Sequence, residues 1–338
     1  MWTRVMRKFF SLTACCAPLL LGFVTSEACG AERLMGIHSA QLMSQSMPWI
    51  AQEAGLFQKY NLDFQLVYIG SSQLALTAML GGDAGVLLDG GLASTRAFVQ
   101  GTTDLVFVGG IKNILTHSIL AKPGIKRLED LKGKKIGVTR IGSNPHYLAI
   151  QALRHFGLES ARDITFIQMG GAPETFAALV SGGIDAGVLA SPLDAQAISL
   201  GFHYVVYGPD LRIPQVAASL ITRRSLIAKR SEVVARFMWV MAEAAKILHV
   251  DKEFAYKVLG KQLRINDRKV LESGYSAEIK VLEPRLAINP EAHQAILDNV
   301  AQIDPRAKKV KPDDLVDRRY LDDMEKSGFF DKLWAEKR

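Results

Sequence analysis

Residues 78–87 are AMLGGDAGVL, and about one hundred residues later residues 178–189 are ALVSGGIDAGVL. The two stretches share a Gly-Gly pair, an Asp and an apolar end, and the second has two additional residues before its Asp. The similarity extends toward the N-terminus, where Gly36 and Gly55 match Gly137 and Gly157. Recurrence over this distance predicts that one structural unit occurs twice in the chain.

Each copy of the repeat follows the order strand, helix, strand, helix, strand. Short apolar runs predict the strands, and a Gly after the last periodic residue is typical of a helix end. The expected strands are residues 34–37, 63–69 and 84–88 in the first copy, and 135–139, 164–169 and 186–190 in the second. This alternation predicts the α/β class, with two lobes that each hold a parallel-rich sheet flanked by helices.

The repeat also predicts the domain organisation. We expect lobe one to comprise residues 32–121 and 215–338, and lobe two to comprise residues 122–214, with hinge strands near 116–122 and 215–222. Beyond Arg223 the apolar residues return at helical spacing, which predicts a helical C-terminal extension packed on lobe one. The apolar face expected there is Val233, Phe237, Val240, Met241, Ala244 and Leu248.

The N-terminus has the pattern of a secretory signal. Arg4, Arg7 and Lys8 precede an uncharged apolar run over residues 9–24. That run is shorter than the about 20 residues that a transmembrane helix needs, so a cleaved signal peptide over residues 1–31 is favoured over a membrane anchor. We therefore expect an exported, periplasmic protein.

The three cysteines restrict the chemistry of the exported chain. Cys15, Cys16 and Cys29 all lie in or beside the signal, and Cys29 or Cys15 would carry the lipid if the protein were a lipoprotein. The remaining body has no cysteine for a disulfide, a thiolate metal site or a nucleophile. HExxH, Walker A, GxGxxG and GxSxG motifs are also absent from the sequence. We expect no cofactor, no metal site and no catalytic residue.

The loops after the predicted strands supply the candidate binding residues, because ligands of parallel sheets bind beyond the carboxyl ends of the strands. Several of these loops begin helices, whose free N–H groups favour anions, and Arg140 suits a carboxylate or sulfonate. The candidates are Ser39, Gln41, Ser71, Ser72, Asp89, Gly90, Gly91, Arg140, Ser143, Asn144, His146, Gly171, Ala172, Ser191 and Pro192. Each has a structural alternative: the Ser and Asn residues cap helices, Arg140 braces a loop, His146 is structural, and Asp89 either binds an amine or caps its own helix.

Three segments carry a resemblance to a known family: PWIAQEAGLF at residues 48–57, LEDLKGKKIGV at 128–138 and GGIDA at 182–186. The chain resembles the periplasmic binding proteins for nitrate, sulfonates and taurine, which include relatives that bind pyrimidine precursors of thiamine. The resemblance implies a type II-like periplasmic-binding-protein fold that closes around one solute. It also implies an ABC permease and its ATPase as partners. Where family members often have an acidic or aromatic residue before the Pro that matches Pro192, this chain has Ala190-Ser191, which makes a cationic solute less attractive.

These observations predict that the protein binds a small anionic or polar organic solute, such as a sulfonate, taurine or a nitrate-like anion, and delivers it to the importer. We expect a monomer that does not bind nucleic acid, because the net charge of +7 is not gathered into a basic stripe with aromatics. Membrane contact is expected only through the transporter or a lipid anchor. Two alternatives stay open. One is an enzyme of the same fold, and a relative of the desulfinases would be expected to use a reactive cysteine. The other is a ligand-sensing module for a membrane receptor.

Overall fold

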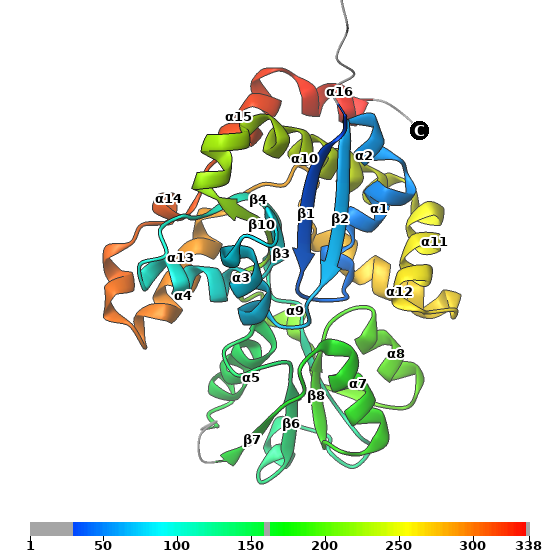
Figure 1. The fold of residues 1–338 in the computed structure, drawn as a ribbon. Coiled ribbons are helices and arrows are strands. Elements are labelled where there is room, and N and C mark those ends of the chain that lie inside the picture. The colour runs from blue at the N-terminus through cyan, green and yellow to red at the C-terminus, as the bar shows by residue number, and fades with distance from the viewer. Residues whose placement is uncertain (1–29, 159–162, 336–338) are drawn as a thin grey trace, which may run out of the picture. The chain divides into compact units, whose positions relative to one another are not determined.

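The computed structural model describes residues 30–158 and 163–335 (Figure 1). Residues 1–29 of the expected signal peptide, which include the candidate lipid sites Cys15 and Cys29, lie outside the described residues. Within the described ranges, no helix combines the length and the apolar character that crossing a bilayer requires.

The described chain contains two five-stranded sheets, with strand orders β2-β1-β3-β10-β4 and β7-β6-β8-β5-β9. The first sheet comprises β1 (Glu32–His38), β2 (Leu62–Tyr68), β3 (Val86–Asp89), β4 (Leu105–Ile114) and β10 (Pro214–Arg223). The second comprises β5 (Ser118–Ala121), β6 (Lys135–Val138), β7 (Thr165–Gln168), β8 (Ala186–Leu189) and β9 (His203–Val206). The six strands predicted from the repeat are all present. Their equivalent places in the two orders, β2-β1-β3 and β7-β6-β8, show the repeat in three dimensions.

The sheets are rich in parallel pairs but mixed. β1, β2 and β3 are parallel, as are β6, β7 and β8, whereas β10 and β5 pair antiparallel with their neighbours. The expectation of two parallel-rich sheets flanked by helices is confirmed, and the antiparallel members are β10 with its neighbours in the first sheet and β5 with its neighbours in the second. The chain enters the second sheet between β4 and β5 and returns between β9 and β10. Both crossings adjoin the segments where we placed the hinge, and the hinge itself stays a prediction.

Helices cover both sheets, and the helices after β10 pack around the first sheet (Figure 1). The earlier helices are α1 (Met47–Glu53), α2 (Leu56–Lys59), α3 (Ser72–Gly81), α4 (Gly91–Val99), α5 (Asn144–His155), α7 (Ala172–Ser181), α8 (Leu193–Ser199) and α9 (Gly208–Leu211). The later ones are α10 (Arg224–Val250), α11 (Lys252–Leu263), α12 (Arg268–Glu278), α13 (Pro290–Ala301), α14 (Pro312–Leu315), α15 (Arg319–Lys326) and α16 (Phe329–Ala335). All six residues of the apolar face predicted on α10 are buried.

The Gly-Gly pair of the repeat ends a helix in each lobe. Gly82 follows α3 with φ of 97°, and Gly182 follows α7 with φ of 81°. This left-handed conformation lets the chain turn from the helix into the next strand, and it costs glycine little because glycine has no Cβ.

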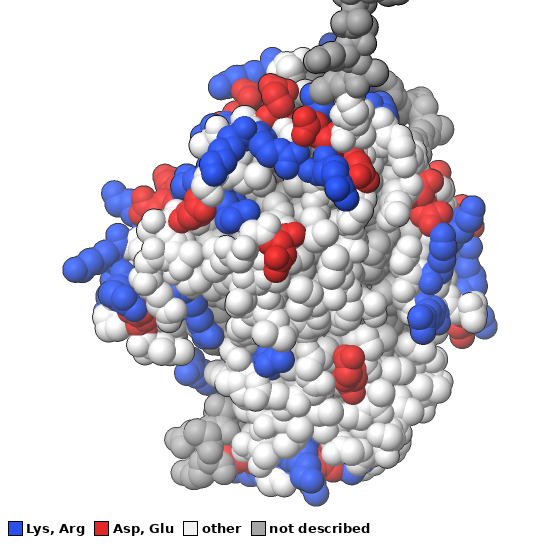
Figure 2. Space-filling view, in the orientation of Figure 1, with Lys and Arg blue, Asp and Glu red and all other residues white. Residues whose placement is uncertain are grey.

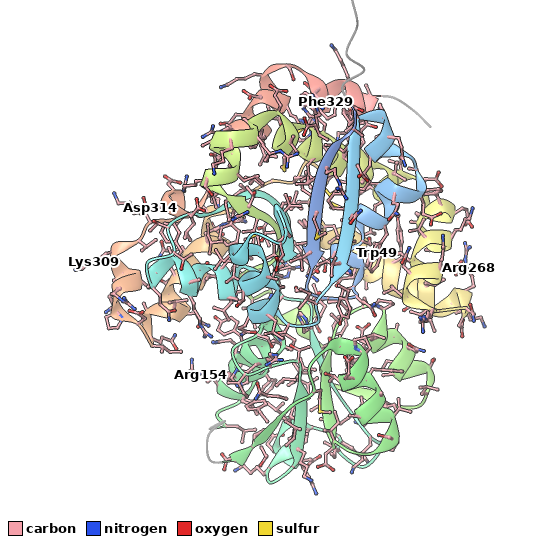
Figure 3. The ribbon with its side chains drawn as sticks, in the orientation of Figure 1. Trp49, Arg154, Arg268, Lys309, Asp314 and Phe329 are labelled. Carbon is pink, nitrogen blue, oxygen red and sulfur yellow. The ribbon has the colours of Figure 1, made fainter. Side chains whose placement is uncertain are left out.

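Apolar side chains lie in the interior, and charged side chains lie mostly at the surface. Trp49 lies inside the molecule, whereas Arg268 and Lys309 lie at its rim (Figure 3). On the face drawn in Figure 2, basic and acidic side chains lie over the upper part and along the edges, and the middle of the face carries few of them.

A buried ion pair joins the C-terminal helices to the first sheet. Lys112 on β4 and Glu278 on α12 are 1% and 2% exposed, and Lys112 Nζ lies 2.9 Å from Glu278 Oε2. Thr116, just beyond β4, accepts a hydrogen bond from Lys112 Nζ at 2.7 Å and donates one to Glu278 Oε1 at 2.5 Å. This network fixes α12 against the segment where the chain leaves the first sheet.

We expect Glu278→Gln to destabilise the protein by about 3 kcal/mol, because removing one partner of a buried pair leaves the other charge uncompensated. The double variant Lys112→Met with Glu278→Gln should recover most of that loss. Urea denaturation measures both changes. The control is Arg268→Gln, which breaks an exposed pair with Glu253 and should cost below about 1 kcal/mol. Equal losses at the two pairs would contradict the assignment.

Candidate functional site

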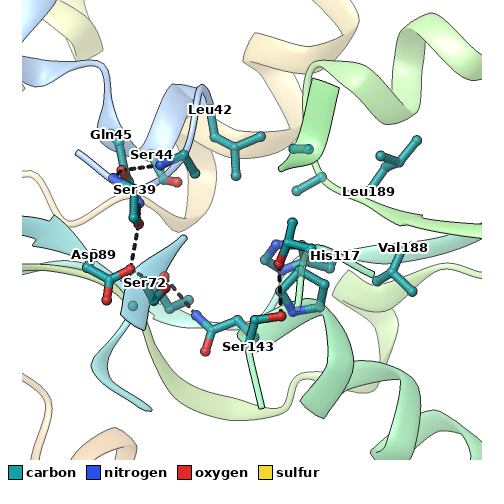
Figure 4. Close-up of a pocket in the computed structure, with 18 of the residues that line it drawn as sticks. Ser39, Leu42, Ser44, Gln45, Ser72, Asp89, His117, Ser143, Val188 and Leu189 are labelled. Carbon is teal, nitrogen blue, oxygen red and sulfur yellow. Dashed lines mark hydrogen bonds between the residues drawn. The ribbon is translucent and has the colours of Figure 1, made fainter. Parts of the chain in front are cut away.

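A cavity lies where the carboxyl ends of β1 and β3 from the first sheet face the carboxyl ends of β6 and β8 from the second (Figure 4). Its space, including the mouth, is about 660 Å³. Polar residues of the first sheet's loops lie on one side, and His117, Val188 and Leu189 lie opposite. Both copies of the repeat therefore contribute equivalent edges to one cavity.

Seven of the predicted binding residues line this cavity: Ser39, Ser72, Asp89, Gly90, Ser143, Asn144 and Ala172. The other eight do not belong to its lining: Gln41, Ser71, Gly91, Arg140, His146, Gly171, Ser191 and Pro192. Sequence reasoning missed other lining residues, which include Ser44, Gln45, Lys112, His117 and Thr139. A role in binding stays a prediction for every candidate.

Several candidates outside the lining have a structural partner. Ser71 caps α3 by accepting a hydrogen bond from Leu74 N at 3.4 Å, and Ser191 Oγ donates to Asp194 Oδ1 at 3.0 Å. His146 lines a neighbouring cavity together with Arg96. The helix-start pattern selected loops that reach the cavity, but it did not distinguish the residue that faces the cavity from the residue that holds the loop.

Asp89, the last residue of β3, is the centre of a hydrogen-bonded group. Ser39 Oγ donates to Asp89 Oδ1 at 2.5 Å, and Ser72 Oγ donates to the same oxygen at 2.6 Å. Gln45 holds Ser39 in place: its Nε2 donates to Ser39 Oγ at 3.1 Å and its Oε1 accepts from Ser39 N at 2.9 Å. The group joins the ends of β1 and β3 to the start of α3.

The Asp89 carboxyl is 1% exposed, and burial raises its pKa to about 6 although the Ser39 and Ser72 hydroxyls and the Gly90 N–H favour the ionised form. Its second oxygen, Oδ2, has no hydrogen-bond partner among the described residues. Across the cavity, burial and the nearby Lys112 charge lower the pKa of His117 to about 3. At neutral pH, Asp89 is therefore ionised and His117 is neutral.

The second lobe meets the first at the start of α5. The N-cap of α5 is Ser143, so our placement of the cap at Asn144 is one residue late. Asn144 instead reaches the first sheet, where its Nδ2 donates to Ala217 O on β10 at 3.1 Å, while its Oδ1 is buried without a partner. A Cβ at Gly90 would lie 2.3 Å from Asn144 Nδ2. Glycine at position 90 thus permits the two lobes to approach closely beside the cavity.

The chain has the fold of the periplasmic binding proteins, because it matches solved proteins of that fold over most of its length. A protein of Bordetella bronchiseptica RB50 matches with a TM-score of 0.76 and 22% identity, covering 87% of this chain and 98% of that one. The alkanesulfonate-binding protein SsuA of Xanthomonas axonopodis pv. citri, solved with MOPS, matches with a TM-score of 0.71 and 20% identity, covering 86% and 100%.

The chain belongs to the NMT1/THI5 like family, whose model matches residues 46–253, more than half of the sequence. A Brucella abortus (strain 2308) protein that is named as a binding protein is 28% identical over 247 residues, which are 69% of this chain and 72% of the relative. The fold also occurs in an enzyme: the desulfurization enzyme DSZB matches with a TM-score of 0.67 and 15% identity, covering 88% and 99%. The fold by itself therefore does not separate binding from catalysis.

We expect Asp89→Asn to change how stability depends on pH. The folded-state pKa of Asp89 is raised to about 6 by burial, so the wild type loses stability as pH rises from the ordinary carboxyl pKa to that value. The variant lacks this loss. Its stability relative to wild type should rise by roughly 3 kcal/mol between pH 4 and pH 7, since one pKa unit is worth about 1.4 kcal/mol.

Thermal or urea unfolding across this pH range measures the difference between the two proteins. Asp83→Asn, at an exposed turn, serves as the control. If the stability of Asp89→Asn relative to wild type does not change with pH, the pKa of this carboxyl is not raised in the folded protein. If that relative stability falls as pH rises, the folded-state pKa of Asp89 is lowered instead.

Proposed function

We propose that the protein is the exported solute-binding component of an ABC importer, and that it captures a small polar or anionic organic solute of the sulfonate or taurine type. The observation that carries this proposal is the cavity lined by both lobes, with Ser39, Ser72 and Asp89 from one and Ser143 and Asn144 from the other. A solute that contacts both walls binds the closed form more tightly than the open form, and so favours closure.

The lobe-two wall supports the anionic part of the proposal. The cavity lining includes Ser143, Asn144 and Pro145 at the start of α5, and Ala172 at the start of α7. Helices of this length present free N–H groups and the positive end of their dipole at the N-terminus. A sulfonate or carboxylate would be favoured at this wall.

Delivery rather than catalysis is favoured by the chemistry of the lining. The cavity is lined by one carboxylate, one lysine in an ion pair and one neutral histidine, and no cysteine occurs at or after residue 30. The partners we propose are a permease and its ATPase, which would receive the solute from a monomeric binding protein held in its closed form.

We expect the chain from residue 32 to 338 to bind one solute per molecule from a panel of alkanesulfonates, taurine, nitrate, bicarbonate, aromatic carboxylates and thiamine-pathway pyrimidines. Ligand at about 1,000 times its Kd stabilises a protein by roughly 4 kcal/mol, so the unfolding midpoint should rise by several degrees. Protein unfolded and refolded beforehand removes carried-over solute. Thermal unfolding and calorimetric titration measure the effect and its stoichiometry.

The matched variants are Gly90→Val and Gly81→Ala. A side chain at position 90 would meet Asn144 Nδ2 beside the cavity, whereas a Cβ at position 81 meets only Asp83 Oδ2 at 3.9 Å. Gly90→Val should lose the ligand-induced shift, and Gly81→Ala should keep it. A shift that survives in Gly90→Val would place the solute elsewhere, and the absence of any shift with the whole panel would count against the proposed solute class.

A further inference from the structure

The charges around the cavity do not balance. Of the described residues that line it, three have ionisable side chains: Asp89, Lys112 and His117. Lys112 Nζ is paired with Glu278 Oε2 at 2.9 Å, and His117 is neutral at physiological pH. Asp89 has no basic partner among its described contacts. The cavity therefore retains one uncompensated negative charge, which a bound solute can neutralise.

The hydrogen-bond directions around Asp89 give the same answer. Ser39 and Ser72 each donate their single hydroxyl proton to Asp89 Oδ1, so both hydroxyls have only lone pairs left for a solute. Asp89 Oδ2 is an acceptor without a hydrogen-bond partner. Gln45 donates to Ser39 and accepts from the Ser39 and Ala40 amides, so it does not reverse the pattern. The side chains of Ser39, Ser72 and Asp89 on this wall therefore offer acceptors to a solute.

The structural contacts of Asp89 do not supply a counter-charge for its carboxylate. The N-cap of α4 is Gly90, and the described side-chain partners of Asp89 are the hydroxyls of Ser39 and Ser72, which lie outside that helix. Burying a carboxylate without a counter-charge is unfavourable, and a neutral side chain of the same shape would avoid the cost. Of the two alternatives left open for Asp89, the cap role is limited to the N–H of Gly90 at the start of α4, and Oδ2 is left without a partner for an amine ligand.

We infer that the solute carries a protonated amine and that this amine pairs with the Asp89 carboxylate against the acceptor wall of Ser39 and Ser72. The inference rests on the proposed function, since it concerns the same cavity. It favours an aminosulfonate or amino acid type of zwitterion, whose anionic end faces the helix starts of lobe two, over nitrate or a plain alkanesulfonate. It also revises the expectation, drawn from Ser191, that a cationic group is less attractive.

Matched probes test the amine directly by calorimetric titration at pH 7.5. Taurine, 2-hydroxyethanesulfonate and ethanesulfonate share the sulfonate and differ in the group that would face Asp89. β-Alanine and propionate form a second pair with a carboxylate. We expect the amine of either set to bind wild type at least tenfold more tightly than its donor-free counterpart. Asp89→Asn should remove that preference, while Asp83→Asn should keep it.

The pH dependence gives a second readout. Binding of the amine probe should weaken about tenfold from pH 7.5 to pH 5, because Asp89 becomes protonated while the ammonium of the probe does not change. The neighbouring groups do not produce this effect: burial lowers the pKa of His38 to about 4 and that of His117 to about 3, and Lys112 is held by Glu278. An anionic solute without a donor would instead bind more tightly at pH 5.

The outcomes separate this inference from the function on which it rests. Equal binding of donor-free and amine probes, or unchanged amine binding in Asp89→Asn, would overturn the amine while leaving a solute-binding protein. If no probe binds wild type, the proposed solute class fails. The role of Asp89 is then decided by the stability of the ligand-free proteins: if Asp89→Asn is less stable than wild type at pH 7.5, Asp89 has a structural role. If Asp89→Asn is instead more stable than wild type, Asp89 remains the candidate ligand for a cationic group.

Discussion

The structure depends on two strands that each complete a sheet after the chain has crossed from the other sheet. β5 follows the first crossing and pairs antiparallel with β8 and β9, while β10 follows the second and pairs antiparallel with β3 and β4. Because each crossing ends in a fully paired strand, neither sheet is complete without chain that has passed through the other. The facing strand ends of both sheets then form the walls of one cavity, and the crossings are the covalent links between them.

The repeat made the strand order within each lobe predictable from sequence, because residues 78–87 and 178–189 specify the same turn from helix to strand. Gly82 and Gly182 have the left-handed conformation that this turn needs. The repeat did not predict the direction of β10 in the first sheet or of β5 in the second. An apolar run such as β4 indicates a strand, but the identity and direction of its partner depend on where distant segments return, which local pattern does not encode.

Some of the residues that line the cavity could likewise be predicted from the sequence, and others could not. Loops that begin helices were recognisable, and they contributed Ser72, Ser143 and Asn144 to the cavity. Lys112 and His117 were not, because Lys112 lies near the end of β4 and His117 in the crossing to β5, and neither segment begins a helix. The pKa of Asp89 was not predictable either, because a carboxyl at a strand end is ordinary in sequence and its pKa is raised by burial in the folded protein.

The distribution of buried charge explains why Asp89 remains available to a solute. Lys112 is the one basic side chain among the described lining residues, and both it and its partner Glu278 are almost fully buried. Thr116 binds both members of that pair, which leaves Lys112 committed to α12 rather than to β3. The hydrogen-bonded group of Asp89 does not include Lys112, since the described side-chain partners of Asp89 are Ser39 and Ser72. Because α12 holds the only lysine of the described lining in a buried pair, Asp89 has no basic partner among its described contacts, and on our inference the ammonium of the solute supplies that partner.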